Sequence, residues 1–352
     1  MAGPFREFVI DDLARFADQG LHPVLATLVH IEGSGPRPAG AQMAIGIPSG
    51  NNSVGDTAMS GFISGGCVED ALAAEAERQV AANRPVMVDY GEGSQVWDIR
   101  LPCGSRIHVC LDPLLSREDM SVIQTARIER RAVDLVTDIS TGDHTLRVSD
   151  RLRDPRSAKS LIERGGPPPV RPVERFARSY LPPVRLILAG TGPVAETLAR
   201  LARDLEYEVI VLSGQRDGPD IPGVEILQGD EAEQVARLAP DPWTGVVSLY
   251  HDHDRELAPL MAALETKAFY VGALGSRRVQ DLRLAALAAK GFHDEQLRRI
   301  DGPAGLPIGA ANPPEIALAI LARVTQSYRS EVDLPLSGRS APQPQGKLNQ
   351  TV

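Results

Sequence analysis

The C-terminal half of the chain contains the sequence Val184-Arg-Leu-Ile-Leu-Ala-Gly-Thr-Gly-Pro-Val-Ala195. An apolar run of strand length leads into the pattern G-x-G-x-x-A. Leu198 and Ala202 then recur at helical spacing before a second apolar run, Glu208 to Leu212. This order of strand, glycine turn, helix and strand is typical of a nucleotide-binding βαβ unit. It predicts a Rossmann-like, doubly wound parallel sheet.

The glycine turn provides candidate ligand-binding groups. Gly190 and Gly192 would let the backbone approach a pyrophosphate at the helix N-terminus. The acidic residue that usually binds a dinucleotide ribose at the end of the second strand is missing, because Ser213 and Gly214 stand there, with Arg216 just beyond. That pattern tolerates the 2′-phosphate of NADP better than a bare ribose, and it fits equally well a Rossmann domain that binds no dinucleotide.

Two further segments are predicted on the same rim of this sheet. Apolar runs at residues 245–250 and 267–273 read as strands, and they are followed by His251 and by Gly275-Ser276-Arg277. In open α/β sheets, ligands bind beyond the carboxyl ends of the strands. Ser276 can cap the next helix, and Arg277 suits an anionic ligand. A His-x-His pair begins at His251, but no third metal ligand is indicated, so a polar rim is the simpler interpretation.

In the N-terminal half, Ser64-Gly65-Gly66-Cys67-Val68-Glu69 reads as the turn between a strand (57–63) and a helix that ends before Pro85. Two glycines before a helix turn the backbone N–H groups toward one point, and the helix N-terminus adds partial positive charge there. A thiol at that point has its thiolate stabilised, which favours nucleophilic chemistry or ligation of metal or sulfur. The alternative is a small buried cysteine beside a tight turn.

Two other loops of this half carry candidate residues. Residues 33–40 contain three glycines and two prolines, which exclude regular structure, and Arg37 is the only cation of this loop. Arg37 suits a phosphate held in bidentate fashion, or it is a solvated surface side chain. Leu101-Pro102-Cys103-Gly104 is a second cysteine-containing turn. Cys110 follows on an alternating strand, where we expect it to be structural.

Composition narrows the class of protein. The net charge of −9, without a basic block, argues against a nucleic-acid partner. Three cysteines without C-x-x-C spacing argue against a disulfide framework or a structural zinc site. The sequence has no signal-peptide pattern and no apolar run of about 20 residues that would span a membrane. We therefore expect a cytoplasmic protein.

The length of 352 residues allows two domains. We predict a mixed α/β cofactor-binding domain over residues 1–164 and a Pro/Gly-rich linker over 165–183. The Rossmann-like domain would span 184–329, and a Ser-, Pro- and Gln-rich tail over 330–352 is expected to be disordered.

Taken in order, these motifs resemble those of the XdhC/CoxI family over nearly the whole chain. The loop at 33–40, the turn at 64–69 and the turn at 101–104 look like its N-terminal domain. The resemblance to its C-terminal Rossmann domain rests on His251-Asp252-His253, residues 270–278, Gly305-Leu306-Pro307-Ile308-Gly309 and Pro314-Glu315-Ile316-Ala317. Pro307 stands where an acid is expected, which leaves the Rossmann ligand open between NADP, a nucleotide form of the cofactor, and nothing.

The resemblance implies a maturation factor more than a turnover enzyme. Such proteins bind molybdenum cofactor, protect it while a terminal sulfur is installed, and pass it to a molybdenum hydroxylase apoenzyme such as xanthine dehydrogenase. The glycine-rich loops and Arg37 suit the molybdopterin phosphate, and Cys67 suits sulfur or molybdenum. A cysteine desulfurase and cofactor-synthesis proteins are further candidate partners, and we expect a homo-oligomer.

The candidate cofactor-binding residues come from all of these motifs, and Cys67 is also the candidate metal ligand. They are Ser34, Arg37, Ser64, Gly65, Gly66, Cys67, Glu69, Cys103, Gly104, Gly190, Gly192, His251, Gly275, Ser276 and Arg277. Two alternatives remain. An NAD(P)-dependent oxidoreductase would rest on residues 190–195 alone, and a thiol enzyme using Cys67 would lack an evident base.

Overall fold

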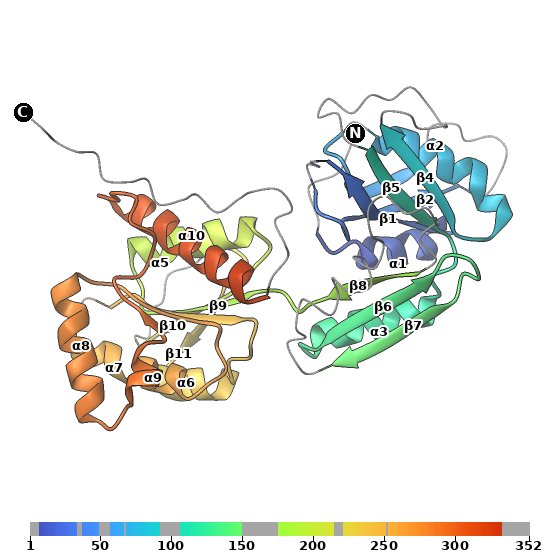
Figure 1. Ribbon diagram of the computed structural model, residues 1–352. Helices are drawn as coiled ribbons and strands as arrows, with labels where there is room; N and C mark the ends of the chain where they lie inside the picture. Colours follow the sequence, from blue (N-terminus) through green and yellow to red (C-terminus); the bar gives the residue numbers. More distant parts are fainter. Residues whose placement is uncertain are drawn as a thin grey trace, which may run out of the picture.

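The computed structural model describes residues 7–33, 37–48, 57–66, 68–91, 106–149, 175–214, 221–250 and 253–332. These residues form two α/β domains that lie side by side (Figure 1). The chain passes from one domain to the other just after strand β8 (Arg175–Tyr180). The fold class expected from the sequence is confirmed.

The N-terminal domain is built on an antiparallel sheet of five strands in the order β3-β2-β1-β5-β4. The strands are β1 (His22–Glu32), β2 (Gln42–Ile47), β3 (Ala58–Gly61), β4 (Val86–Gly91) and β5 (Arg106–Asp112). Helix α2 (Glu69–Gln79), continued by the short helix η1 (Val80–Ala82), packs on one face through buried Leu72 and Ala76. Helix α1 (Ile10–Asp18) packs on the other face. The sheet is therefore covered on both sides by apolar side chains.

A second, three-stranded sheet extends this domain, in the order β7-β6-β8. Helix α3 (Arg117–Ile128) starts at a capping box made by Ser116 and Asp119. Strands β6 (Ala132–Asp138) and β7 (His144–Ser149) form an antiparallel hairpin. A buried ion pair, His144 Nε2 to Asp112 Oδ2 at 2.6 Å, joins this hairpin to β5.

The prediction of a linker over residues 165–183 was wrong for its C-terminal part. Residues 175–180 form β8, which pairs antiparallel with β6 from Val133↔Tyr180 to Asp138↔Arg175. Two arginines interrupt the alternation in Arg-Phe-Ala-Arg-Ser-Tyr, so hydrophobic period alone does not reveal this strand. Cross-strand hydrogen bonds and the burial of Phe176 and Tyr180 hold it in place.

The C-terminal domain is a parallel sheet of six strands in the order β11-β10-β9-β12-β13-β14. These are β9 (Arg185–Ala189), β10 (Glu208–Ser213), β11 (Glu225–Gln228), β12 (Thr244–Ser248), β13 (Tyr270–Ala273) and β14 (Ile300–Asp301). The chain runs outward from β9 to one edge and then from β12 to the other. The topological switch point, where Rossmann folds bind ligands, thus lies between β9 and β12.

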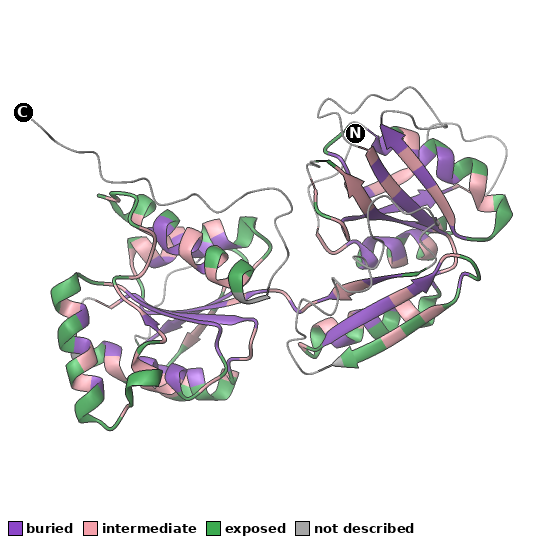
Figure 2. Cartoon of the chain, in the orientation of Figure 1, coloured by how far each residue is buried: buried purple, intermediate pink, exposed green. Residues whose placement is uncertain are grey.

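Helices cover both faces of this sheet, and the strands between them are buried (Figure 2). One face carries α5 (Pro193–Asp204) and α10 (Pro313–Val332). The other carries α6 (Glu231–Leu238), α7 (His253–Leu264), α8 (Arg277–Ala289) and the short α9 (Asp294–Leu297). Among the described helices, none combines the length and apolarity that a bilayer crossing requires.

Candidate functional site

The turn that precedes α2 folds around the carboxylate of Glu69. Glu69 Oε1 accepts hydrogen bonds from the backbone N–H groups of Ile63 at 2.9 Å, Ser64 at 2.7 Å and Gly65 at 3.2 Å. Glu69 Oε2 accepts from those of Gly66 at 2.8 Å and Val68 at 3.1 Å. The N–H groups therefore converge on one point, and in this structure that point holds an internal anion.

The hydrogen bonds to Glu69 decide its charge. Burial by itself would raise the pKa of this carboxyl group, since its side chain lies within the turn. The backbone N–H donors and the Ser64 hydroxyl outweigh burial and hold the pKa below its usual value. Glu69 is thus negatively charged at neutral pH at the N-terminus of α2, where the helix dipole also favours an anion.

Arg37 lies beside this turn. Its guanidinium packs over the Phe62 ring, 5.1 Å from the centroid, and Phe62 immediately precedes the residues that wrap Glu69. Arg37 also forms an ion pair with Glu7, Nη2 to Oε2 at 2.5 Å, and its side chain is only 14% exposed. The structure thus places Arg37 against Phe62, two residues before Ser64, where the predicted turn begins.

Five predicted site residues lie outside the described residues: Ser34, Cys67, Cys103, Gly104 and His251. Cys110 is described, and it is fully buried in an apolar cluster with Val29 and Phe176, as a structural cysteine would be. Burial raises the pKa of its thiol, so it stays protonated.

The sequence did not reveal a polar cluster on the sheet face that carries Cys110. A β-bulge between Leu28 and His30 shifts the register, so that His30 pairs with His108 across the strands. The two rings are 5.6 Å apart, and His108 Nε2 lies 3.2 Å from Glu32 Oε1. Within the described ranges, no cluster of three or more His, Cys, Asp or Glu side chains could hold a metal ion.

On the Rossmann rim, the glycine turn has the expected backbone. Gly190 and Gly192 have φ values of 109° and 118°, which glycine adopts without strain. The Tyr250 ring lies across Gly190, where a Cβ would be 3.5 Å from Tyr250 Cζ. No described atom lies within 4 Å of the corresponding point at Gly192. A side chain at residue 190 would therefore contact Tyr250, whereas the space beside Gly192 is free of described atoms.

A carboxylate from another element reaches the end of β10. Glu231, at the start of α6, accepts a hydrogen bond from Gly214 N–H at 2.9 Å and another from the Tyr250 hydroxyl. Burial raises the pKa of Glu231. Ser213 and Gly214 stand where an acidic residue was expected at the end of β10. Nothing in the sequence indicated that the side chain of Glu231 would lie there instead.

The remaining rim residues follow β13. Ser276 caps α8 by accepting a hydrogen bond from Val279 N–H at 3.3 Å, as predicted, and Arg277 is exposed beside it. Deeper in the domain, Arg283 Nη2 forms a 2.7 Å ion pair with Glu256 and also donates to the Leu274 carbonyl at 2.7 Å. These contacts hold the β13–α8 turn against α7.

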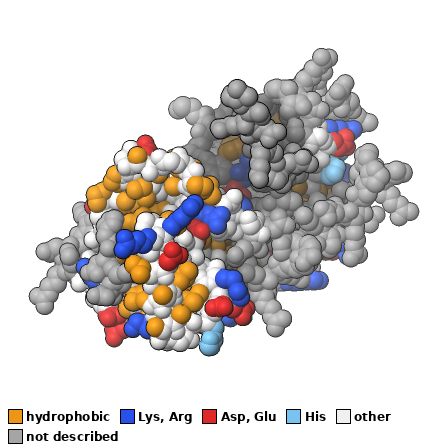
Figure 3. Space-filling view, turned by 60° about the vertical axis from the view of Figure 1, so that its left-hand side comes forward, with side chains coloured by type: hydrophobic (Ala, Val, Ile, Leu, Met, Phe, Trp, Pro, Cys, Tyr) orange, Lys and Arg blue, Asp and Glu red, His pale blue; other side chains and the backbone are white. Residues whose placement is uncertain are grey.

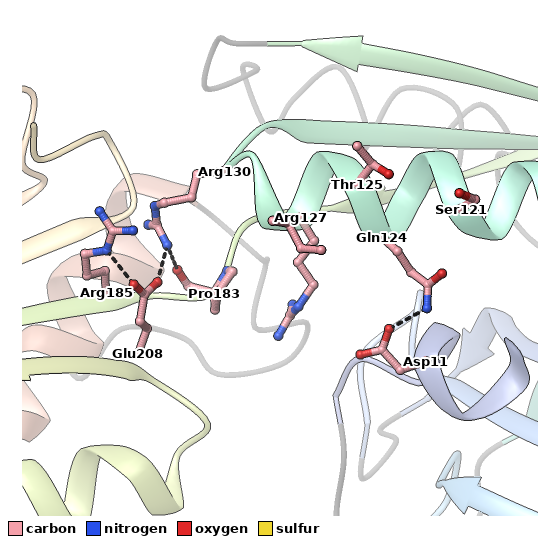
Figure 4. Close-up of a pocket in the computed structure, with 10 residues that line it drawn as sticks. Asp11, Ser121, Gln124, Thr125, Arg127, Arg130, Pro183, Arg185 and Glu208 are labelled. Carbon is pink, nitrogen blue, oxygen red and sulfur yellow. Dashed lines mark hydrogen bonds and ion pairs between the residues drawn. The ribbon is translucent and has the colours of Figure 1, made fainter. Parts of the chain in front are cut away.

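A cavity of about 570 Å³ lies between the two domains (Figure 4). Helix α3 forms one wall, from which Arg127 points into the opening, and Asp11, Pro183 and Arg185 line other parts of it. Arg130 links the domains through Glu208 at 2.8 Å and Asp241 at 2.5 Å. No site residue predicted from the sequence is among the described residues that line this cavity.

Figure 3 shows the C-terminal domain from outside, with hydrophobic and cationic side chains interspersed over its surface. Leu282, Ile308 and Leu318 contribute to the apolar surface of this domain, and each is more than half exposed. Exposed apolar side chains that lie singly are ordinary, so they assign no partner by themselves.

Comparison with known proteins agrees with this architecture. Residues 16–91 match the XdhC and CoxI family, and residues 186–324 match the XdhC Rossmann domain. The molybdenum cofactor insertion chaperone PaoD of Escherichia coli (strain K12) is 33% identical over 328 residues, which cover 91% of this chain and 90% of PaoD. A probable xanthine dehydrogenase subunit of Bacillus subtilis (strain 168) is 26% identical over 328 residues, covering 87% and 93% of the two chains.

A solved structure has the same fold. A crystal structure described as a xanthine dehydrogenase from Bacillus halodurans superposes with a TM-score of 0.71 at 24% identity, covering 93% of this chain and 98% of that one. The protein is thus of the class in which a Rossmann domain follows a domain built on an antiparallel sheet. It belongs to the XdhC and CoxI family.

Proposed function

We propose that this protein binds molybdenum cofactor and delivers it to a molybdenum hydroxylase of the xanthine dehydrogenase type. One observation carries the proposal: Arg37 packs over Phe62, the residue just before the segment that holds the glycine turn and leads into Cys67 and α2. A cation and a cysteine-containing turn at one place suit a ligand with a phosphate at one end and a sulfur-bound metal at the other. The name of PaoD, a cofactor insertion chaperone, supports the same role.

The residues present fit such a cargo. Gly65 and Gly66 have positive φ values, and no described atom lies within 4 Å of the point where either would carry a Cβ. A ligand can therefore approach the backbone closely at this turn. Arg37 would hold the phosphate, and Cys67 would hold sulfur or molybdenum as a thiolate. Glu69 would keep the turn in its folded shape.

Cys103 and Ser34 are proposed as further contacts, since each belongs to a loop of the same domain that the family motifs cover. The rim residues Gly190, Gly192, His251, Gly275, Ser276 and Arg277 are proposed for a second ligand, with NADP or a nucleotide form of the cofactor as candidates. We further propose a cytoplasmic location, a homo-oligomer, and contacts with the apoenzyme and with a cysteine desulfurase.

The test is maturation of a client enzyme in cells that lack their own factor, with each variant expressed at an equal level. Cys67→Ser should fold but leave the client inactive, because an alcohol at a helix N-terminus stays protonated where a thiol ionises. Cys103→Ser should give an intermediate client activity. Cys110→Ala is the matched control and should rescue fully. Full rescue of client activity by Cys67→Ser would show that the Cys67 thiolate is not required for maturation.

A further inference from the structure

The carboxylate of Glu7 lies among arginines that come from distant parts of the chain. Arg37 Nη2 is 2.5 Å from Glu7 Oε2, and Arg178 Nη2 is 3.5 Å from Glu7 Oε1. Arg37 belongs to the loop after β1, and Arg178 to strand β8. Two guanidinium groups thus share one carboxylate that is 43% exposed.

Arg178 belongs to this site by its packing as well as by its charge. Its aliphatic stem lies against Gly40, where a Cβ would be 3.4 Å from Arg178 Cδ. Gly40 closes the loop that carries Arg37. Arg178 Nε is buried and has no hydrogen-bond partner among the described residues. Since a buried guanidinium N–H without a partner is costly, this atom has capacity for a further acceptor.

The two arginines keep Glu7 ionised. Burial by itself would raise the pKa of this carboxyl group, but the hydrogen bond from Arg37 and the positive charges of Arg37 and Arg178 outweigh burial and hold the pKa below its usual value. Glu7 is therefore held as an anion between the two guanidinium groups.

Glu7 also contacts the C-terminal domain, because its backbone N–H donates a 3.1 Å hydrogen bond to Glu206 Oε2. Planar guanidinium groups bind phosphate oxygens in pairs, and Arg37 and Arg178 together carry twice the charge of the one carboxylate between them. Once Glu7 has left, the two guanidinium groups are therefore suited to a dianion.

We propose that Arg37 and Arg178 form one phosphate site, and that Glu7 occupies it as an internal anion until a ligand replaces it. The inference rests on the proposed function and makes it more specific: the ligand group is the phosphate monoester of the cofactor. Binding would exchange an ion pair within the chain for one between the chain and the ligand.

Titration of the full chain with inorganic phosphate, followed by calorimetry, tests the site itself. Arg178→Gln and Arg37→Gln should each weaken phosphate binding about tenfold, the effect of losing one charge-assisted contact. Glu7→Gln should tighten binding by a similar factor, because it removes the competing carboxylate. Arg200→Gln is the control and should bind like wild type, because Arg200 is an exposed residue of α5 whose guanidinium donates a hydrogen bond to Thr197 within the same helix.

The outcomes separate this inference from the proposed function. If Arg178→Gln does not fold, the Arg37 and Glu7 variants still decide the result. Unchanged phosphate affinity in Glu7→Gln and Arg37→Gln overturns the site and leaves a structural ion pair. In a second experiment, molybdenum cofactor released from a purified molybdenum enzyme replaces phosphate. Phosphate binding that depends on these arginines, without cofactor binding, would keep the site and reject the proposed function. Cofactor retention that is equal in wild type and Arg178→Gln but reduced in Arg37→Gln would reject the two-arginine site and keep the proposed function.

Discussion

Replacement of Glu69 by Gln tests how the cysteine-containing turn is built. The wild-type carboxylate accepts three backbone N–H groups on one oxygen and two on the other. An amide offers only one acceptor oxygen, so its NH₂ group must face at least two of these donors. The variant therefore loses two charge-assisted hydrogen bonds and leaves two N–H groups opposed to another donor.

The expected loss of stability follows from these contacts. A hydrogen bond to a charged group contributes about 1.5 kcal/mol or more, so two of them correspond to about 3 kcal/mol. Equilibrium unfolding in urea at neutral pH measures this difference. Asp70→Asn is the matched control, because Asp70 is an exposed acid in the same first turn of α2. It should lose less than about 1 kcal/mol, the usual effect of one charge on a helix end.

The dependence on pH gives a second readout. The pKa of Glu69 is lower in the folded protein than its ordinary value of 4.5. Its contribution is therefore complete above the unfolded pKa and is lost as the pH falls through the folded pKa. The gap between wild type and Glu69→Gln should narrow over that acidic range. A Glu69→Gln variant that is no less stable than Asp70→Asn would refute the described hydrogen-bond network.

Other parts of the chain give further predictions. Cys67→Ser should lower the free energy of unfolding by about 1 kcal/mol or less while abolishing client maturation, and buried Cys110→Ala should leave maturation intact. Gly192→Asp would put a carboxylate at the Rossmann turn and should abolish any thermal shift caused by NADPH, whereas equal shifts in both proteins would count against a dinucleotide there. Arg283→Met should cost about 3 kcal/mol in urea unfolding, because the pair it breaks is at most 2% exposed. Burial lowers the pKa of the His144 imidazole, but the hydrogen bond to the Asp112 carboxylate and the nearby acidic charges raise it by more. Wild type should therefore lose stability relative to His144→Gln as the pH rises through the pKa that His144 has in the folded protein.

The Rossmann domain could be predicted because its signals are local. An apolar strand, two glycines and a proline follow one another within a short stretch of sequence. In the structure they form β9 (Arg185–Ala189), a turn with Gly190 and Gly192 at positive φ, and Pro193 at the first position of α5. The parallel order of the strands then follows from the alternation of strand and helix. The cap at Ser276 was visible for the same reason, since an N-cap depends on one side chain and one nearby N–H.

The candidate site was less predictable because its contacts are not local. The glycines of the Ser64–Gly66 turn showed that N–H groups would converge, but an acid in the first turn of a helix is common, so nothing marked Glu69 as the group they would bind. Arg37 pairs with Glu7, which lies 30 residues away in the sequence, just before α1, and α1 packs on the sheet. The bulge beside His30 depends in the same way on strand pairing, which a single strand's sequence does not encode.

We propose that this chain holds molybdenum cofactor at a site that includes Arg37 and Cys67. The most direct measurement is pterin fluorescence of the oxidised extract from protein purified natively, from cells that make the cofactor. Wild type should retain molybdopterin, whereas Cys67→Ser and Arg37→Gln should retain much less at equal folded concentration. Wild-type protein that carries no pterin, or variants that carry as much as wild type, would contradict the claim.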